Sequence, residues 1–144
     1  MTEPDSPTTR NEPLPQPGGW VVEVSVSPEW FALQDSSLES PVQQPPRTVT
    51  LDEGYVLIGR ESATRDVHPL VQADDDAGCS RRHADLSWID GHWVLRDLNS
   101  VNGTYLQRAG AGFPPVEVTT AVPIDTGDAV YVGAWTKLVL RRVH

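Results

Sequence analysis

The chain has 144 residues, a length that fits one domain and allows about two-thirds of the unfolded surface to be buried without a disulfide or a metal. Its 20 acidic and 11 basic residues give a formal net charge of −9, which argues against a general binder of nucleic acid or anionic membranes, because long-range repulsion would oppose both. A single cysteine, Cys79, excludes an internal disulfide framework, and no apolar run approaches the about 18 residues of a transmembrane helix, so we expect a soluble protein in the reducing cytoplasm.

Residues 1–19 contain five prolines and end in Gly18-Gly19, without the apolar segment of a signal peptide. Such a composition cannot bury enough apolar surface to offset the entropy of folding, so we predict a disordered arm over 1–19 and a folded domain over 20–143. The charge is also uneven: nine acids against two bases leave residues 1–54 at −7, and eleven against nine leave residues 55–144 at −2. The part of the chain that carries the motifs below is therefore nearly neutral.

The first element expected after the arm is a half-buried strand. Valines at every second position between Trp20 and Val26 alternate with polar residues, the period of a strand with one buried face. We expect the apolar residues of 30–33 to continue this strand after Pro28. Residues 34–46 are expected to form a long loop.

A hairpin is predicted farther along the chain, where Ala84–Ile89 and His92–Leu98 flank Asp90-Gly91, the dipeptide that favours a type I′ turn. No segment has a helical apolar period. Other short strands are predicted at 48–51, 54–58, 67–73, 104–106, 116–119, 129–132 and 137–143. Many short strands without helices indicate an all-β sandwich or barrel, in which loops at one end carry the function.

Three polar clusters lie between these strands: Gly59-Arg60, then the run 80–83 (Ser-Arg-Arg-His), then the run 97–104, which ends in Ser-Val-Asn-Gly-Thr. In this order and spacing, the clusters resemble those of a forkhead-associated (FHA) domain, and the resemblance covers about residues 20–142. It implies a two-sheet β-sandwich of about eleven strands whose loops bind phosphothreonine peptides. The implied partners are threonine-phosphorylated proteins and their Ser/Thr kinase, with no cofactor.

A phosphothreonine carries about −1.5 to −2 charges and three strong acceptor oxygens, so its site needs a cation and several neutral donors. The resemblance implies that Arg60 is the chief charge contact, since its planar fork suits phosphate. It assigns a hydroxyl and a main-chain N–H contact to Ser80, and contacts to phosphate or peptide backbone to Arg81. Asn102 is expected to orient the peptide backbone. Val101 stands where a hydroxyl residue is frequent, so only its main chain is expected to contribute.

Other residues are implied to support the site rather than to bind: Gly59, His83, Ser100, Gly103 and Thr104. His83 is expected to be a buried strut whose ring holds the binding loops. Arg82 is expected to lie outside the site on a solvated face. Specificity is expected in the loops at 74–79 and 133–135, and the acidic run 74–76 is either solvated or selects basic peptides.

Four alternatives remain open. Catalysis would use Ser80 with His83, but no third orienting residue or oxyanion hole is evident. A metal site would use Cys79 and His83 with His68, His92 or the three aspartates, but the spacing matches no zinc pattern, so we expect no metal. An FHA scaffold could bind partners without phosphate. Finally, Thr8 and Thr9 in the arm are possible phosphosites that would create an internal ligand. The sequence leaves the oligomeric state open.

Overall fold

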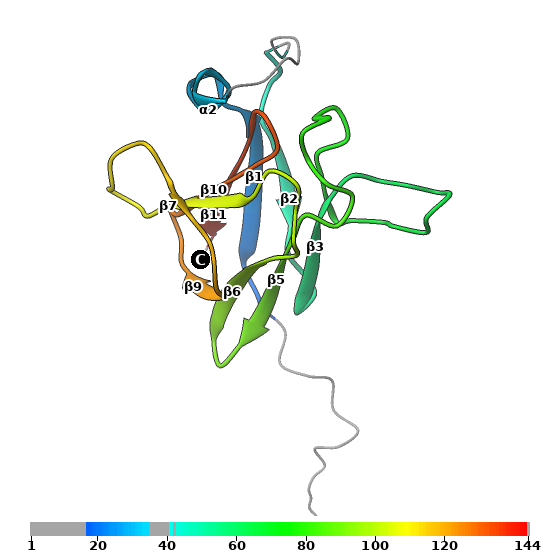
Figure 1. The fold of residues 1–144 in the computed structure, drawn as a ribbon. Coiled ribbons are helices and arrows are strands. Elements are labelled where there is room, and N and C mark those ends of the chain that lie inside the picture. Colours follow the sequence, from blue (N-terminus) through cyan, green and yellow to red (C-terminus); the bar gives the residue numbers. More distant parts are fainter. Residues whose placement is uncertain (1–16, 35–40, 42, 144) are drawn as a thin grey trace, which may run out of the picture.

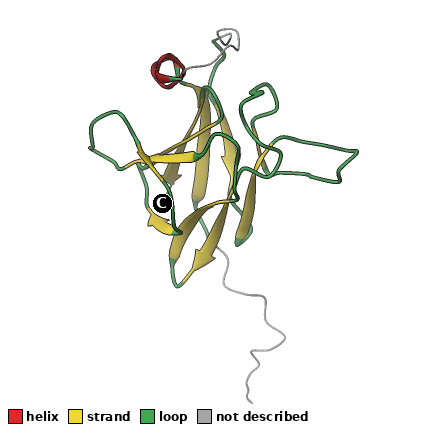
Figure 2. Ribbon diagram, viewed as in Figure 1, coloured by secondary structure: helices red, strands yellow, loops and turns green. Residues whose placement is uncertain are grey.

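A computed structural model describes residues 17–34, 41 and 43–143, which form two β-sheets packed face to face (Figures 1 and 2). The six-stranded sheet has the order β2 (Arg47–Thr50), β1 (Trp20–Val26), β11 (Thr136–Arg142), β10 (Ala129–Val132), β7 (Thr104–Gln107) and β8 (Val116–Glu117). The five-stranded sheet has the order β4 (Val71–Gln72), β3 (Tyr55–Gly59), β5 (Ala84–Ile89), β6 (His92–Asp97) and β9 (Val122–Ile124). The predicted all-β sandwich is confirmed.

The core lies between the two sheets and is built by alternation along the strands. In β1, Trp20, Val22 and Val24 are buried while the residues between them are partly exposed, as a strand with one buried face requires. Opposite them, Trp93 and Leu95 of β6 are fully buried. One continuous apolar cluster joins both sheets. Its close packing fixes the strands from which the loops at the sandwich ends extend.

The predicted hairpin is confirmed. Strands β5 and β6 pair antiparallel, with Ile89 opposite His92. The turn residues Asp90 and Gly91 both have positive φ, at 51° and 80°, which a type I′ turn requires. In Figure 1 this hairpin lies at the lower end of the sandwich.

The expected continuation of the first strand over 30–33 is wrong, because Pro28–Leu33 forms a short helix, α2. Its start carries a complete helix signal. The Ser27 hydroxyl accepts a hydrogen bond from Trp30 N at 3.1 Å, Pro28 occupies the first turn and Glu29 places an acid there. One side of α2 covers the outer face of the six-stranded sheet, where Trp30 packs 5.4 Å from the Tyr131 ring.

One further strand prediction needs correction, and one strand was missed. Of residues 67–73, only Val71–Gln72 forms a strand, β4, which pairs parallel to the end of β3, while Val67 makes an isolated antiparallel bridge to Ser62. Pro69, between them, has no N–H for a ladder. Strand β9 was not predicted, because Pro123 at its centre makes the sequence unlike a strand. β9 is the edge of its sheet, where a proline is tolerated.

The end of the sandwich opposite the β5–β6 hairpin carries α2 and the β10–β11 turn (Figure 1). The domain boundary at residue 20 stays a prediction, since most of the predicted arm lies outside the described residues. Gly19 O does accept a hydrogen bond from Val143 N at 2.7 Å, so the two ends of the described chain are joined. Among the described residues, no helix has the length and apolar character needed to cross a membrane.

Candidate functional site

Arg60 lies directly after β3, against the loop that joins β4 to β5. Its main-chain N–H donates to Arg81 O at 3.1 Å, and its side-chain Nε donates to Cys79 O at 2.6 Å. These two bonds fix the plane of the guanidinium. Within the described part of the chain, its two terminal NH₂ groups have no hydrogen-bond partner. The guanidinium is therefore held in one orientation, with both NH₂ groups able to donate to a ligand.

The Ser80 hydroxyl is also set up to donate. Its Oγ accepts the main-chain N–H of Val101 at 3.1 Å, which leaves the hydroxyl proton for another acceptor. The main-chain N–H of Ser80 is already used, because it donates to Nδ1 of His83 at 2.9 Å. Of the two contacts expected from Ser80, only the hydroxyl therefore remains available.

Asn102 follows in the β6–β7 loop, beside Ser80. Its Nδ2 donates to Gly78 O at 2.7 Å, which orients the amide and ties the β6–β7 loop to the β4–β5 loop. Val101 exposes 86% of its surface at the tip of the loop. Arg81 is exposed as well. The structure thus brings Arg60, Ser80 and Asn102 together through a shared loop.

His83 joins the β4–β5 loop to the β6–β7 loop. Its side chain is fully buried; Nδ1 accepts from Ser80 N and Nε2 lies 2.8 Å from Gly103 O. An acceptor at Nδ1 requires the neutral tautomer with the proton on Nε2, which then donates to Gly103 O. Burial lowers the pKa of His83 against the weaker opposing effect of the Gly103 carbonyl.

The β6–β7 loop is organised by Asp97, which the sequence reasoning did not select. Its carboxylate accepts the hydroxyl of Ser100 at 2.5 Å and that of Thr104 at 2.6 Å. Ser100 Oγ in turn accepts Gly103 N at 2.9 Å. Burial alone would raise the pKa of Asp97, but the hydrogen bonds from Ser100 and Thr104 outweigh it and lower that pKa. The three-residue spacing between Asp97 and Ser100 is typical of an Asx-type turn and could have revealed this role.

Gly59 makes room for the approach of β3 to the β4–β5 loop. A Cβ on Gly59 would lie 1.8 Å from Arg81 O. We expect Gly59→Ala to force the two backbones apart and to cost about 2 kcal/mol or more of unfolding free energy. Thermal unfolding measures this, with Gly112→Ala as the control because its Cβ would meet nothing within 4 Å. Equal melting of the two variants would contradict this packing.

The neutral state of His83 predicts a dependence of stability on pH. Because its pKa in the folded chain lies below the ordinary value of 6.5, the unfolded chain binds the proton more readily. The contribution of neutral His83 to the unfolding free energy should therefore be fully present above about pH 6.5, and it should decrease as the pH falls below that value. Urea unfolding at pH values on both sides of about 6.5 measures this change in unfolding free energy.

The exposed His68 supplies the control for that experiment. Hydrogen bonds that the His68 ring donates to the carboxylates of Glu61 and Asp66 raise the pKa of His68, so its contribution has the opposite sign. In His68→Gln the decrease on acidification should be steeper. A stability that stays level down to about pH 5.5 in this variant would contradict the neutral assignment of His83.

A second buried carboxylate, Asp76, holds the β4–β5 loop against the β10–β11 turn. Asp76 is 1% exposed, and its oxygens accept main-chain N–H groups of the turn at 2.9–3.2 Å and the Thr136 hydroxyl at 2.8 Å. The accepted main-chain donors belong to Gly78, Ala134, Trp135 and Thr136. Asp76 therefore has a structural role in the acidic run 74–76, and only its neighbours Asp74 and Asp75 are exposed.

The contacts of Ser80 and His83 do not form a nucleophile–base pair. Nδ1 of His83 accepts from the Ser80 main chain, and Nε2 faces Gly103 O, so neither ring nitrogen contacts the Ser80 hydroxyl.

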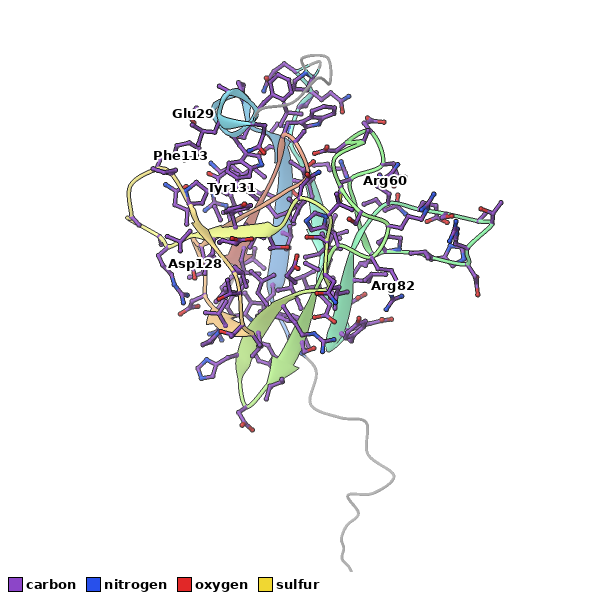
Figure 3. All side chains as sticks on the ribbon, viewed as in Figure 1. Glu29, Arg60, Arg82, Phe113, Asp128 and Tyr131 are labelled. Carbon is purple, nitrogen blue, oxygen red and sulfur yellow. The ribbon has the colours of Figure 1, made fainter. Side chains whose placement is uncertain are left out.

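Burial raises the pKa of the neighbouring Cys79 thiol to about 12. Arg82 is exposed and lies away from Arg60, beside β3 (Figure 3). Among the described residues, no group of three or more His, Cys, Asp or Glu is arranged to hold a metal.

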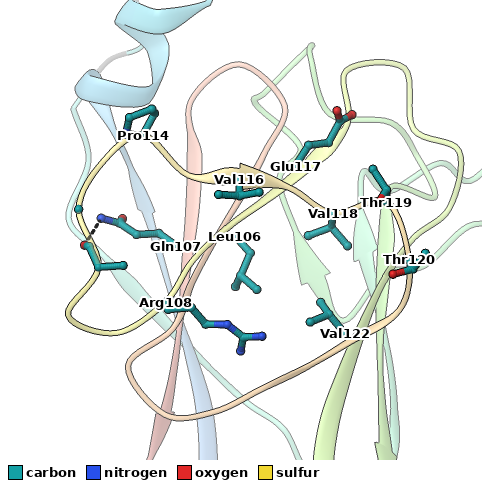
Figure 4. Close-up of a pocket in the computed structure, with 12 residues that line it drawn as sticks. Leu106, Gln107, Arg108, Pro114, Val116, Glu117, Val118, Thr119, Thr120 and Val122 are labelled. Atoms are coloured by element: carbon teal, nitrogen blue, oxygen red, sulfur yellow. Dashed lines mark hydrogen bonds between the residues drawn. The ribbon is translucent and has the colours of Figure 1, made fainter.

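An apolar groove of about 350 Å³ lies elsewhere, between β7, β8, β9 and the loop after β7 (Figure 4). Leu106, Val118 and Val122 line it. Two of its polar side chains are already hydrogen-bonded: Gln107 donates to Ala111 O, and Arg108 donates to Pro123 O and to Asp128. It contains none of the site residues predicted from the sequence.

The sequence profile of the FHA domain matches residues 56–133. The chain is 46% identical over 85 residues to FhaB, an FHA domain-containing protein of Mycobacterium tuberculosis, which covers 59% of this chain and 46% of FhaB. It is 31% identical over 87 residues to the oxoglutarate dehydrogenase inhibitor of Corynebacterium glutamicum, which covers 58% of this chain and 54% of that protein. The chain spans about half the length of these curated relatives.

Solved structures give the same answer for the fold. The FhaA FHA domain, crystallised in complex with the intracellular domain of Rv3910, aligns at a TM-score of 0.52 and 28% identity, over 83% of this chain and 99% of that one. A chain from a structural and functional analysis of phosphothreonine-dependent FHA domain interactions aligns at a TM-score of 0.52 and 27% identity, over 84% of this chain and 95% of that one.

Proposed function

Since this chain belongs to the FHA domain family, whose members are interaction modules, we propose that it binds phosphothreonine peptides and acts as an adaptor in Ser/Thr kinase signalling. Its partners are then proteins phosphorylated on threonine, together with their kinase, in the cytoplasm. The chain performs no catalysis in this role. Because it covers only about half of its curated relatives, this proposal concerns the domain over residues 20–143.

One observation carries the proposal: Arg60 and Asn102 both bond to the segment 78–80 that contains Ser80, and Arg60 and Ser80 keep donors available there. The guanidinium fork would take two phosphate oxygens and the Ser80 hydroxyl a third. Asn102, oriented by Gly78 O, retains its side-chain carbonyl for a peptide N–H. Arg81 adds a second cation, which is exposed. This set matches a doubly charged group with three acceptor oxygens.

Selection of threonine over serine needs more than apolar burial. One methyl group contributes about 0.8 kcal/mol, which is about fourfold in affinity. We expect the γ-methyl to contact the β6–β7 loop, where it also restricts the rotation of the phosphorylated side chain. Phosphoserine peptides should therefore bind more weakly rather than not at all.

Nuclear magnetic resonance titration would map the site. Adding a phosphothreonine peptide to ¹⁵N-labelled protein should shift the side-chain Nε–H of Arg60 and the main-chain amides of Val101 and Asn102. The same peptide without phosphate should leave these signals in place. Phosphate-dependent shifts confined to the β5–β6 hairpin would place the ligand on another face and overturn the assignment.

The arm offers a form of regulation, because Thr8 and Thr9 are tethered to a domain proposed to bind phosphothreonine. A tethered ligand can reach about millimolar effective concentration, enough to displace weak partners. Both threonines lie outside the described residues. Kinase-treated protein should lose affinity for an added phosphopeptide, measured by fluorescence anisotropy, while kinase-treated Thr8→Ala/Thr9→Ala protein should retain it. Equal loss in both would exclude this regulation.

A further inference from the structure

The apolar groove between β8 and β9 lies where both sheets end. β8 is the last strand of the six-stranded sheet, and β9 is the last strand of the five-stranded sheet. The groove of about 350 Å³ therefore opens at an edge of the sandwich (Figure 4). Val116 lines it and still exposes 73% of its surface. An exposed apolar side chain beside an open apolar groove at a sheet edge is typical of an interaction surface.

Two opposite charges lie on opposite sides of the groove, Arg108 and Glu117 (Figure 4). One NH₂ group of Arg108 donates to Pro123 O at 2.8 Å and to Asp128 at 3.1 Å. Its Nε and its other NH₂ group have no partner among the described residues. The exposed carboxylate of Glu117 likewise has no hydrogen bond or ion pair with the described part of the chain. Both groups can therefore pair with charges of a bound protein.

The charges that line the groove cancel, on a chain whose formal net charge is −9. Two copies of this chain repel each other at long range, and the repulsion is smallest where the contacting surfaces carry no net charge. A closed two-fold contact also needs a surface that is complementary to itself. The groove meets this condition, because a two-fold axis across it brings Arg108 of one copy to Glu117 of the other. The same axis lays the exposed Val116 over the groove of the other copy.

We propose that a second copy of this chain binds at the groove and forms a symmetric dimer, with two Arg108–Glu117 ion pairs and with Val116 of both copies buried. The loop on one side of the groove carries Phe113, which lies on the opposite side of the sandwich from Arg60 (Figure 3). The dimer therefore leaves both candidate phosphothreonine sites open. With the proposed function, it offers two sites to a doubly phosphorylated partner and raises the apparent affinity without a new contact.

Sedimentation equilibrium of the whole chain tests the dimer without any phosphopeptide, so the result is independent of the proposed function. We expect a dissociation constant of about 10–100 µM, because a surface of this size is at the small end of specific interfaces. Val116→Lys should weaken the dimer at least about tenfold. Arg108→Glu and Glu117→Arg should each do the same, because each substitution brings like charges together. A mixture of these two single variants should recover dimerisation as a heterodimer, and the double variant should recover it alone.

Arg82→Glu is the matched control, because it changes the net charge as much as Arg108→Glu does, at an exposed residue away from the groove. It should keep the dimer. Thermal unfolding verifies that each variant is folded, and Val116→Lys and Glu117→Arg alter exposed side chains that Arg108→Glu leaves in place. A protein that stays monomeric up to about 1 mM would overturn the dimer, and the groove would then be free for a different partner. A dimer that survives both Val116→Lys and Glu117→Arg would form through another face and would overturn this surface.

Discussion

Arg60→Ala should weaken phosphothreonine-peptide binding by about tenfold to 150-fold. The substitution removes the only guanidinium that the main chain of the β4–β5 loop aims, through the bond from its Nε to Cys79 O, within the described residues. A charge-assisted hydrogen bond contributes about 1.5–3 kcal/mol, and a bidentate pair more, which gives this range. Isothermal titration with one phosphothreonine peptide measures the change.

The matched control is Arg82→Ala, which removes the same charge from an exposed arginine away from the site (Figure 3). Its affinity should change by less than about threefold, because an exposed charge acts only through screened long-range attraction. Arg60→Lys should fall between the two, since lysine keeps the charge but lacks the fork. If Arg60→Ala bound as tightly as Arg82→Ala, the phosphate contact would be elsewhere.

Asp76→Ala should produce the largest loss of stability, more than about 4 kcal/mol, with a fall in melting temperature of about 10 °C or more. The side chain is 1% exposed and accepts four main-chain N–H groups and one hydroxyl, which alanine would leave without partners. Differential scanning calorimetry measures both quantities.

The neighbouring Asp75→Ala removes the same charge and is the control, since Asp75 is exposed and its side chain contacts only the Gln44 amide at 3.5 Å among the described residues. It should melt within about 2 °C of the unsubstituted protein. Because Asp76 also fixes Gly78, Asp76→Ala should lose peptide affinity even at temperatures where it is folded. A melting temperature equal to that of Asp75→Ala would show that the carboxylate is dispensable.

Local signals predicted the parts of the fold that depend on short spacing. The alternation in β1 and the dipeptide Asp90-Gly91 each specify a structure within a few residues, and both were confirmed. Helix α2 was missed although Ser27 and Pro28 carry its start signal, because six residues are too few for an apolar period to become visible. Strand β9 was missed because Pro123 is tolerated only where a strand lies at the edge of a sheet. That position depends on the whole sheet and cannot be inferred from the residues of the strand itself.

The residues of the candidate site divide in the same way, into those that the sequence indicated and those whose role depends on distant contacts. Resemblance to a family selected Arg60, Ser80 and Asn102, and the structure brings these residues together, although their roles in binding stay predictions. The sequence did not indicate Asp76, because its partners lie 58–60 residues away in the β10–β11 turn. An acidic run in a loop looks the same whether its members face solvent or a set of buried N–H groups.

The central claim is that this domain recognises phosphothreonine, and one measurement tests it most directly. Fluorescence anisotropy would compare a degenerate phosphothreonine peptide library with the same library after phosphatase treatment and with its phosphoserine counterpart. We predict micromolar binding of the phosphothreonine library, weaker binding of the phosphoserine library and none after phosphatase treatment. Equal binding before and after phosphatase treatment would contradict the account and would indicate a scaffold that binds its partners through another face.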